Sequence, residues 1–152
     1  MRVVVQRVKE AQVKVDGRLV GQIGQGMLVF LGVAREDNSS CADYLIKKLT
    51  ELRMFDDAEG KMNVSARDAG AQFLVVSQFT LYGNCNKGRR PSFDEAADPV
   101  RGEELYNYFV AQLKATQAVV ETGKFRAMMD VSLINDGPVT FIVDSKSEGS
   151  TS

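Results

Sequence analysis

Hydrophobic and polar positions along the N-terminal part of the chain predict a succession of short β-strands. Arg2–Val8 is rich in valine and alternates weakly between apolar and polar positions, which is typical of a strand. Gln12–Val15 predicts a second strand, and the Asp16-Gly17 pair after it is a strong hairpin signal that makes Leu19–Ile23 its partner. The solid apolar run Met27–Val33 then predicts a central strand of the sheet.

Two later segments show the spacing of amphipathic helices. The first follows Ser39 or Ser40, either of which can cap a helix. Its apolar positions form one stripe: Ala42, Leu45, Ile46, Leu49 and Leu52. The second begins with Asp98 as the cap and Pro99 at the first helical position. Its apolar face, which we expect to pack on a sheet, consists of Leu105, Tyr108, Phe109 and Leu113.

Further strands are predicted from the middle of the chain onward, at Arg53–Phe55, Phe73–Gln78, Ala118–Glu121, Met129–Ile134 and Val139–Val143. Asn63–Gly70 is polar and predicts a loop. Two substantial helices are too few to cover both faces of a parallel sheet of so many strands. The predicted fold class is therefore α/β of the α+β kind. It has a mixed, largely antiparallel sheet with a barrel-like core and two main helices packed to one side.

Length and composition set the broad class of the protein. The chain has 152 residues, which predicts one domain, assigned to residues 1–144, and a small polar tail, 145–152, that we expect to be disordered. No apolar run approaches the length that spans a bilayer, and the N-terminal residues lack the features of a signal peptide. We therefore expect a cytoplasmic protein with no membrane partner. Cys41 and Cys85 are interpreted as free thiols.

The sequence contains no histidine, which restricts the chemistry that it can carry out. Ser-His-Asp and Cys-His arrangements need an imidazole base, and most catalytic zinc sites use histidine ligands. A hydrolase of this composition must use backbone dipoles, carboxylates, hydroxyls or groups of its own substrate. We expect neither a metal nor another cofactor. The net charge of −1 argues against a protein that coats nucleic acid, although a local basic patch can still grip an RNA end.

Polar residues follow one buried strand without a turn signal. Phe73–Val76 is apolar at every position, as in a strand covered on both faces, and Ser77, Gln78 and Thr80 come directly after it. These groups either meet a ligand or satisfy each other inside the fold. A second polar stretch, Asn135–Thr140, contains a Gly-Pro pair between two β-like runs, so a hairpin turn is its first interpretation.

Charged residues gather in two loops. Lys87, Arg89 and Arg90 lie close together in the polar loop after the strand just described. A charge run is usually solvated surface, but its position after the candidate site makes phosphate contact the alternative. Asp56 and Asp57 belong to an acidic turn that lacks the spacing of a calcium-binding loop, and we interpret it as solvated.

Ser77–Leu81 and Asn135–Thr140 together resemble motifs of the D-aminoacyl-tRNA deacylases. The other matching segments occur in the family's order: Gln6-Arg7-Val8 in the first strand, Lys87–Phe93 as a basic loop, and Thr122-Gly123 with Phe125 and Met129 before the Gly-Pro pair. The resemblance extends from Met1 to about Asp144. Several separated motifs in order are far more specific than any single one.

The resemblance implies an enzyme that hydrolyses the ester between a D-amino acid and the 3′-terminal ribose of tRNA, and also releases glycine mischarged on tRNA-Ala. It assigns catalysis to Ser77, Gln78, Phe79 and Thr80, chiefly through backbone N–H groups that bind the developing oxyanion. Phe79 and Thr80 would line the pocket for the amino acid and ester, and Gln78 would hydrogen-bond nearby. The family is thought to steer the attacking water with the 2′-hydroxyl of the substrate, which implies no cofactor.

The resemblance also implies a homodimer with a gate that selects chirality. Gly137-Pro138, with its peptide bond cis, would project two carbonyl groups into the pocket of the partner subunit. They would accept the α-amino group and leave no room for an L side chain, whereas glycine would pass. Arg7 would hold this motif in place, unless it is an ordinary surface charge at a strand end. The remaining substrate-binding candidates are Phe125 and Met129.

Two other functions stay open beside the deacylase. A binding module would dock an RNA end on Lys87, Arg89 and Arg90 without turnover. A hydrolase of another ester or amide would use Thr80 as its nucleophile, although no suitable base is evident beside it. Arg126 departs from the family pattern, in which we expect a small residue. It either faces solvent without consequence, or faces the pocket, where it touches RNA or narrows the mouth.

Overall fold

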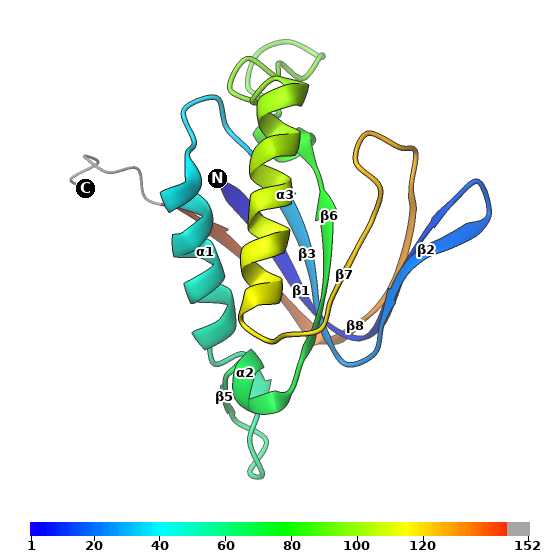
Figure 1. The fold of residues 1–152 in the computed structure, drawn as a ribbon, viewed down its shortest axis with the longest axis vertical. Helices are drawn as coiled ribbons and strands as arrows, with labels where there is room; N and C mark the ends of the chain where they lie inside the picture. The colour runs from blue at the N-terminus through cyan, green and yellow to red at the C-terminus, as the bar shows by residue number, and fades with distance from the viewer. Residues whose placement is uncertain (146–152) are drawn as a thin grey trace.

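A computed structural model describes residues 1–145, and six of its strands form one mixed sheet (Figure 1). The strands of this sheet are β1 (Arg2–Val15), β2 (Arg18–Ile23), β3 (Gly26–Gly32), β6 (Gln72–Ser77), β7 (Val120–Thr122) and β8 (Asp130–Asp144). A separate small hairpin pairs β4 (Phe55–Asp56) with β5 (Met62–Val64). The expected tail lies outside the described residues from 146 onward. Its first residue, Ser145, donates its N–H to the Met1 carbonyl oxygen at 2.8 Å.

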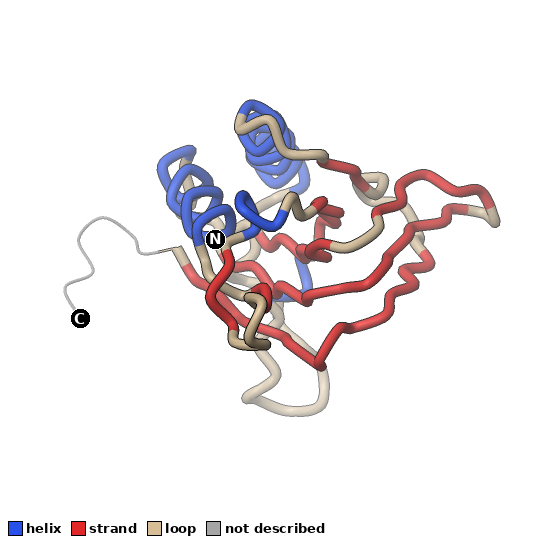
Figure 2. Tube along the Cα trace, turned by 90° about the horizontal axis from the view of Figure 1, so that it is seen from below, coloured by secondary structure: helices blue, strands red, loops and turns tan. Residues whose placement is uncertain are grey.

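The sheet is largely antiparallel, as predicted. β1 pairs antiparallel with β2, β3 and β8, whereas β3–β6 and β6–β7 are parallel pairs. β2 approaches β7 closely at Gly21, where a Cβ atom would lie 2.3 Å from the Thr122 carbonyl oxygen. Glycine at this position therefore allows the sheet to curl toward a barrel-like shape (Figure 2). The predicted fold class is confirmed.

The two strands predicted at the N-terminus are one continuous strand. β1 runs unbroken through Lys9 and Glu10 because β8 pairs with it on the other side along almost its whole length. The Asp16-Gly17 hairpin is confirmed, with φ of 51° and 76° at its two central residues. Both angles are positive, as a two-residue turn between twisted strands requires.

The hairpin interpretation of Asn135–Thr140 is wrong, because the segment lies inside the single strand β8. Asn135 pairs with Val8 and Thr140 pairs with Gln6, so residues 136–139 bulge out of the ladder between them. Local turn signals did not distinguish a bulge from a turn, since both favour Gly and Pro. The long-range pairing with β1 decides the outcome.

Two long helices cover one face of the sheet: α1 (Ser39–Glu51) and α3 (Pro99–Ala115). The cap of α1 is Asn38, whose Oδ1 accepts from the Ser40 N–H at 3.0 Å, so the expected caps, Ser39 and Ser40, already belong to the helix. The predicted start of α3 is confirmed, because Asp98 Oδ1 accepts from the Arg101 N–H at 2.9 Å. Polar side chains at these positions satisfy N–H groups that have no partner inside the helix.

The central strand β6 contributes to a core on each of its faces. Phe73 and Val75 pack with the helices, whereas Leu74 and Val76 pack into a second cluster on the opposite side. The predicted helix stripes are buried except at Leu52 and Tyr108, which are half-buried. Tyr108 is only half-buried because its hydroxyl donates to Asp43 Oδ1 at 2.8 Å, and Tyr106 lies in the core.

The segment predicted as a polar loop, Asn63–Gly70, contains regular structure. It includes most of β5 and the short helix α2 (Ala66–Ala69). Ser65 caps α2 by accepting from the Asp68 N–H at 3.1 Å, and Gly70 ends it in the left-handed conformation. None of the helices within residues 1–145 is long and apolar enough to cross a membrane.

Candidate active site

The chain leaves the sheet directly after Ser77. The Gln78 N–H still donates to the Leu31 carbonyl oxygen at 2.8 Å, which extends the pairing with β3 by one residue. The next four residues form a 3₁₀ helix, η1 (Phe79–Tyr82). The polar residues that follow the buried strand therefore stand at a junction between a rigid strand and a tight helical turn.

Two backbone N–H groups at this junction are free to bind a ligand. Those of Leu81 and Gly83 donate to the carbonyl oxygens of Gln78 and Thr80, at 3.2 and 2.9 Å. Those of Phe79 and Thr80 donate to no group within residues 1–145, and no side chain caps η1. The first N–H groups of any helix lack partners inside the helix. Neighbouring donors of this kind can bind negative charge on an oxygen atom.

Arg2 fixes the far end of η1. Its Nη1 donates to the Leu81 carbonyl oxygen at 3.0 Å, and its Nε donates to Asp144 Oδ1 at 2.7 Å. The guanidinium carbon also lies 5.1 Å from the centre of the Tyr82 ring. Burial raises the pKa of the Tyr82 hydroxyl, so this ring stays neutral beside the cation. The turn that carries the free N–H groups is thus attached to the ends of both β1 and β8.

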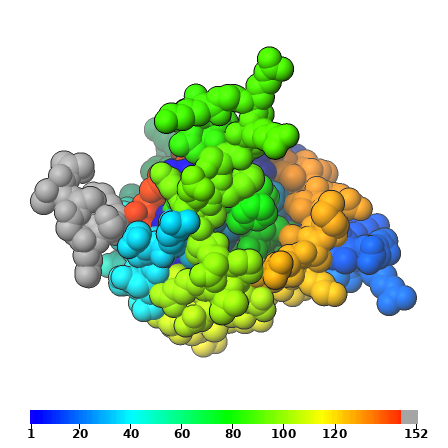
Figure 3. Space-filling view, turned by 90° about the horizontal axis from the view of Figure 1, so that it is seen from above, coloured from blue at the N-terminus to red at the C-terminus, as the bar shows by residue number. Residues whose placement is uncertain are grey.

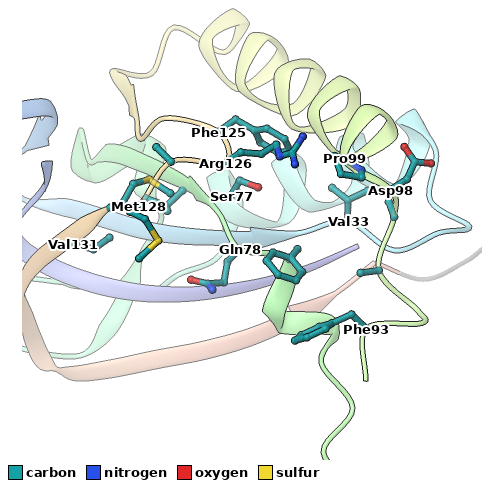
Figure 4. A pocket seen from close by; sticks show the side chains of 17 residues that line it. Val33, Ser77, Gln78, Phe93, Asp98, Pro99, Phe125, Arg126, Met128 and Val131 are labelled. Atoms are coloured by element: carbon teal, nitrogen blue, oxygen red, sulfur yellow. The ribbon is translucent and has the colours of Figure 1, made fainter. Parts of the chain in front are cut away.

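A pocket of about 670 Å³ opens beside this junction (Figure 4). Ser77, Gln78 and Phe79 form one part of its wall. Residues 125–129, from the loop between β7 and β8, form another, and residues 96–99 with Gly102 contribute the start of α3. The structure therefore brings together five predicted site residues: Ser77, Gln78, Phe79, Phe125 and Met129.

Thr80 does not line this pocket in the single chain, contrary to the expectation, because η1 turns it toward solvent. Its Oγ1 accepts from Nε2 of Gln78, the only hydrogen bond of its side chain within residues 1–145. No carboxylate or amine in that range hydrogen-bonds to Thr80. A Thr80 nucleophile would therefore lack a base in the same chain.

Three aromatic residues that the sequence did not single out as site residues support the pocket. Phe93 lies 5.0 Å from the exposed Phe79, ring centre to ring centre. The Tyr106 ring lies 5.8 Å from that of Phe125, and its hydroxyl donates to the Val75 carbonyl oxygen at 2.8 Å. Burial raises the pKa of Tyr106 to about 12, so this hydroxyl remains a donor at neutral pH. Tyr82, under Arg2, is the third. The helical spacing of Tyr106 with Phe109 and Leu113 could have indicated its burial, but Tyr108 was assigned to the buried face instead.

Arg7 is buried, with 6% of its surface exposed, so its interpretation as a surface charge is wrong. Its Nε donates to the Asp136 carbonyl oxygen at 2.9 Å, and its Nη1 donates to the Met54 carbonyl oxygen at 2.9 Å and to Asp56 at 3.2 Å. Arg7 therefore attaches the bulge of β8 to β1 and to the β4–β5 hairpin. The guanidinium is well satisfied, as a buried cation must be.

The Gly137-Pro138 peptide bond is cis, and both residues are exposed. The motif is further fixed by Asn135, whose Oδ1 accepts from the Val139 N–H at 2.7 Å. Neither Gly137 nor Pro138 lines the pocket of its own chain. If these residues bind substrate, they must therefore do so in the pocket of a second copy of the chain. Their assignment to substrate binding stays a prediction.

The basic loop projects from the surface beyond η1 (Figure 3). Asn84 and Ser92 close its base with two backbone hydrogen bonds of 2.7 and 2.9 Å. Lys87, Arg89 and Arg90 are all exposed, and none of them forms an ion pair within residues 1–145. Within the same range no cluster of three or more His, Cys, Asp or Glu side chains could hold a metal ion.

Comparison of the sequence with known families gives one match over most of the chain. The sequence model of the D-Tyr-tRNA(Tyr) deacylase family matches residues 4–144. A D-aminoacyl-tRNA deacylase of Desulfatibacillum aliphaticivorans is 60% identical over 146 residues, which are 96% of this chain and 100% of the relative. A protein of the same name from Koribacter versatilis is 57% identical over 148 residues, with 97% and 99% covered.

Two solved structures share the fold. One, described as a c-Myc DNA unwinding element binding protein, has a TM-score of 0.92 and 39% identity, over 97% of this chain and 100% of that chain. The other, described as a probable eukaryotic D-amino acid tRNA deacylase, has a TM-score of 0.82 over 94% and 98% of the two chains. Its identity is 18%, so it supports the fold alone.

Proposed function

The chain belongs to the D-Tyr-tRNA(Tyr) deacylase family and hydrolyses the ester bond of D-aminoacyl-tRNA, and on that premise we propose that the ester is cleaved in the pocket beside η1. One observation carries this proposal: the N–H groups of Phe79 and Thr80 donate to no other group within residues 1–145. Phe79 lines the pocket where a rigid strand ends, and Thr80 follows it in η1. Fixed donors at such a place can stabilise the negative charge that an ester carbonyl develops during hydrolysis.

In the proposed reaction a water molecule attacks the ester directly. Its oxygen forms a bond to the carbonyl carbon, and the bond from that carbon to the ribose oxygen breaks. The proton that the water loses passes to the departing ribose oxygen. Each N–H donor to the intermediate oxyanion contributes on the order of 2.7–4 kcal/mol. The 2′-hydroxyl of the substrate orients the water, since the sequence has no histidine and Thr80 has no basic partner within residues 1–145.

A partner subunit completes the site in this account. Gly137 and Pro138 are exposed, are held rigidly through Arg7 and Asn135, and lie away from the pocket of their own chain. The same strand exposes Ile134, Phe141 and Ile142 at 48, 38 and 68%, an apolar surface suited to burial against a second copy. Backbone carbonyls at a fixed position would reject an L side chain and admit glycine, so glycyl-tRNA(Ala) is a further proposed substrate.

The basic loop contacts the tRNA in this account. Lys87, Arg89 and Arg90 are exposed and unpaired within the described residues, in a protein whose net charge is −1. They follow η1 directly, so they lie beside the place where the 3′ end enters. The likeness to a protein named for binding a DNA element also supports a surface that accepts nucleic acid. Phosphate contacts position an RNA without reading its sequence.

A tRNA that ends in 2′-deoxyadenosine tests the role assigned to the 2′-hydroxyl. We expect its D-tyrosyl ester to be cleaved at least about 100-fold more slowly, since positioned acid–base groups contribute about 10²–10⁴ in rate. The control is D-tyrosyl-tRNA with normal adenosine at sub-stoichiometric protein, where repeated turnover distinguishes an enzyme from a protein that only binds RNA. Equal rates on the two substrates would exclude the proposed role of the 2′-hydroxyl.

A further inference from the structure

Arg126 occupies a backbone position that suits glycine better. The loop between β7 and β8 makes a tight turn in which the Ala127 N–H donates to the Lys124 carbonyl oxygen at 3.1 Å. Arg126 is the third residue of this turn, with φ of +65°. A turn with a positive φ at that position alone normally takes Gly or Asn there. For a residue with a Cβ atom the left-handed conformation costs roughly 1–2 kcal/mol.

The two other non-glycine residues with positive φ have local explanations. Asp16 belongs to the two-residue hairpin turn, and Gln117 follows the end of α3, where a left-handed residue commonly ends a helix. Arg126 lies in neither setting. A strained residue that persists beside a functional site is a reason to ask what its side chain does there.

The Arg126 side chain lines the pocket of the proposed reaction. Figure 4 shows it beside Phe125 and extending toward Pro99, at the start of α3. Its side chain is exposed, and its guanidinium forms no hydrogen bond or ion pair within residues 1–145. The other charged residue of the pocket wall, Asp98, already accepts from the Arg101 N–H. The wall therefore presents one exposed cation whose donors are free for a ligand.

We propose that Arg126 is a substrate-binding residue whose guanidinium binds the phosphodiester that joins the terminal nucleoside to the rest of the tRNA. This inference rests on the proposed function, because it requires the ester to lie in this pocket. The α-carboxyl group of the substrate is esterified and carries no charge, so the phosphodiester is the anion that all such substrates share near the reacting carbon. A planar guanidinium matches a phosphate with two parallel hydrogen bonds.

The test compares two substrates that differ in this phosphate: D-tyrosyl-tRNA and 3′-O-D-tyrosyl-adenosine. For Arg126→Gly we expect KM for the tRNA ester to rise about tenfold with little change in kcat. The slope of log KM against log salt concentration should decrease by about one, which is the contribution of a single phosphate contact. The rise in KM should be confined to the tRNA substrate, and Arg126→Lys should show a smaller rise than Arg126→Gly.

Stability and a matched control separate this role from misfolding. Arg126→Gly should leave the melting temperature unchanged or raise it, because the turn position favours glycine. Lys124→Ala removes the same charge two residues away, from a side chain that does not line the pocket, and should change neither substrate's kinetics.

Several outcomes would overturn the inference. One is an unchanged KM for the tRNA ester in Arg126→Gly. Another is an equal rise of KM for both substrates, which would mean that the guanidinium contacts the aminoacyl-adenosine itself. A loss confined to D-aspartyl- and D-glutamyl-tRNA would assign it to acidic amino-acid side chains instead. Failure of the proposed function gives a different result. If the ester is not cleaved in this pocket, substitutions of other residues that line it would also leave the hydrolysis of both substrates unchanged.

Discussion

At the scale of single residues, the proposed chemistry depends on backbone atoms more than on side chains. Phe79 is the first residue of η1, and the residue before it, Gln78, lies outside the helical region with φ of −143° and ψ of 82°. A strand that ends in a helical turn leaves such N–H groups without partners whatever the side chains are. The sequence indicated this place because polar residues follow an apolar strand without a turn signal.

A proline at position 79 tests the role of that backbone donor. Proline suits the first position of a helical turn, and the preceding residue, Gln78, is outside the α-helical conformation that a following proline disfavours. Phe79→Pro should therefore fold, yet it lacks the N–H group. Relative to Phe79→Ala, which loses the same ring and keeps the N–H, we expect kcat for D-tyrosyl-tRNA to fall about 10²–10³-fold. Equal kcat values in the two variants, at equal melting temperatures, would show that this N–H binds no oxyanion.

At the scale of elements, sequence patterns predicted the strands and helices better than their connections. Asp16-Gly17 was predicted as a hairpin correctly, because both of its residues adopt positive φ. Asn135–Thr140 carries comparable turn signals but bulges within β8, since β1 supplies pairing partners on both sides of the bulge. No local pattern reports whether a partner strand continues past a Gly-Pro pair.

The pocket was predicted only in part for the same reason. Ser77 and Gln78 were found from the strand that precedes them, and Phe79, Phe125 and Met129 were found through a family resemblance. The start of α3 lines the same pocket, but it approaches from a segment distant in the sequence, and the sequence left open whether Arg126 faces the pocket. Hydrophobic periodicity identifies which face of a helix is buried, and it does not say which end of that helix meets the end of a strand.

The basic loop is an element whose role can be measured directly. Replacing Lys87, Arg89 and Arg90 by Ala should weaken tRNA binding. The slope of the log binding constant against log salt concentration should become shallower by about two to three, because up to three phosphate contacts are lost. The matched control replaces three other exposed cations outside the basic loop: Lys47 in α1, Arg53 just after α1, and Arg67 in α2. An equal effect of the two triple substitutions would return this loop to the role of solvated surface.

At the scale of the whole molecule, one chain separates the two parts that the proposed selection of chirality uses. The free N–H groups lie at the end of β6, whereas Gly137 and Pro138 lie in the bulge of β8 and do not line the pocket of the same chain. The proposed homodimer, in which each subunit contributes one part to each site, would bring the two parts together. The central claim is therefore that the catalytic turn of one subunit works with the Gly137-Pro138 motif of the other.

A mixed dimer of two variants tests this claim most directly. The first chain carries Phe79→Pro, which disables its catalytic turn and leaves its Gly137-Pro138 motif intact. The second carries Gly137→Ala, since an added Cβ would lie 2.7 Å from Val139 Cγ2 and displace the motif. Each chain bears a different affinity tag, so that only mixed dimers are purified. As a homodimer, the Gly137→Ala variant should cleave L-tyrosyl-tRNA as well as the D form.

The measurement is the ratio of D-tyrosyl-tRNA to L-tyrosyl-tRNA hydrolysis by the mixed dimer. If the site is shared between subunits, the one working catalytic turn faces the intact motif of its partner. The mixed dimer then cleaves D-tyrosyl-tRNA at about half the wild-type rate per dimer, since one of the two symmetric sites remains, and rejects the L form. If each site is built from a single chain, the working turn keeps its own displaced motif, and cleavage of L-tyrosyl-tRNA by the mixed dimer would contradict the account.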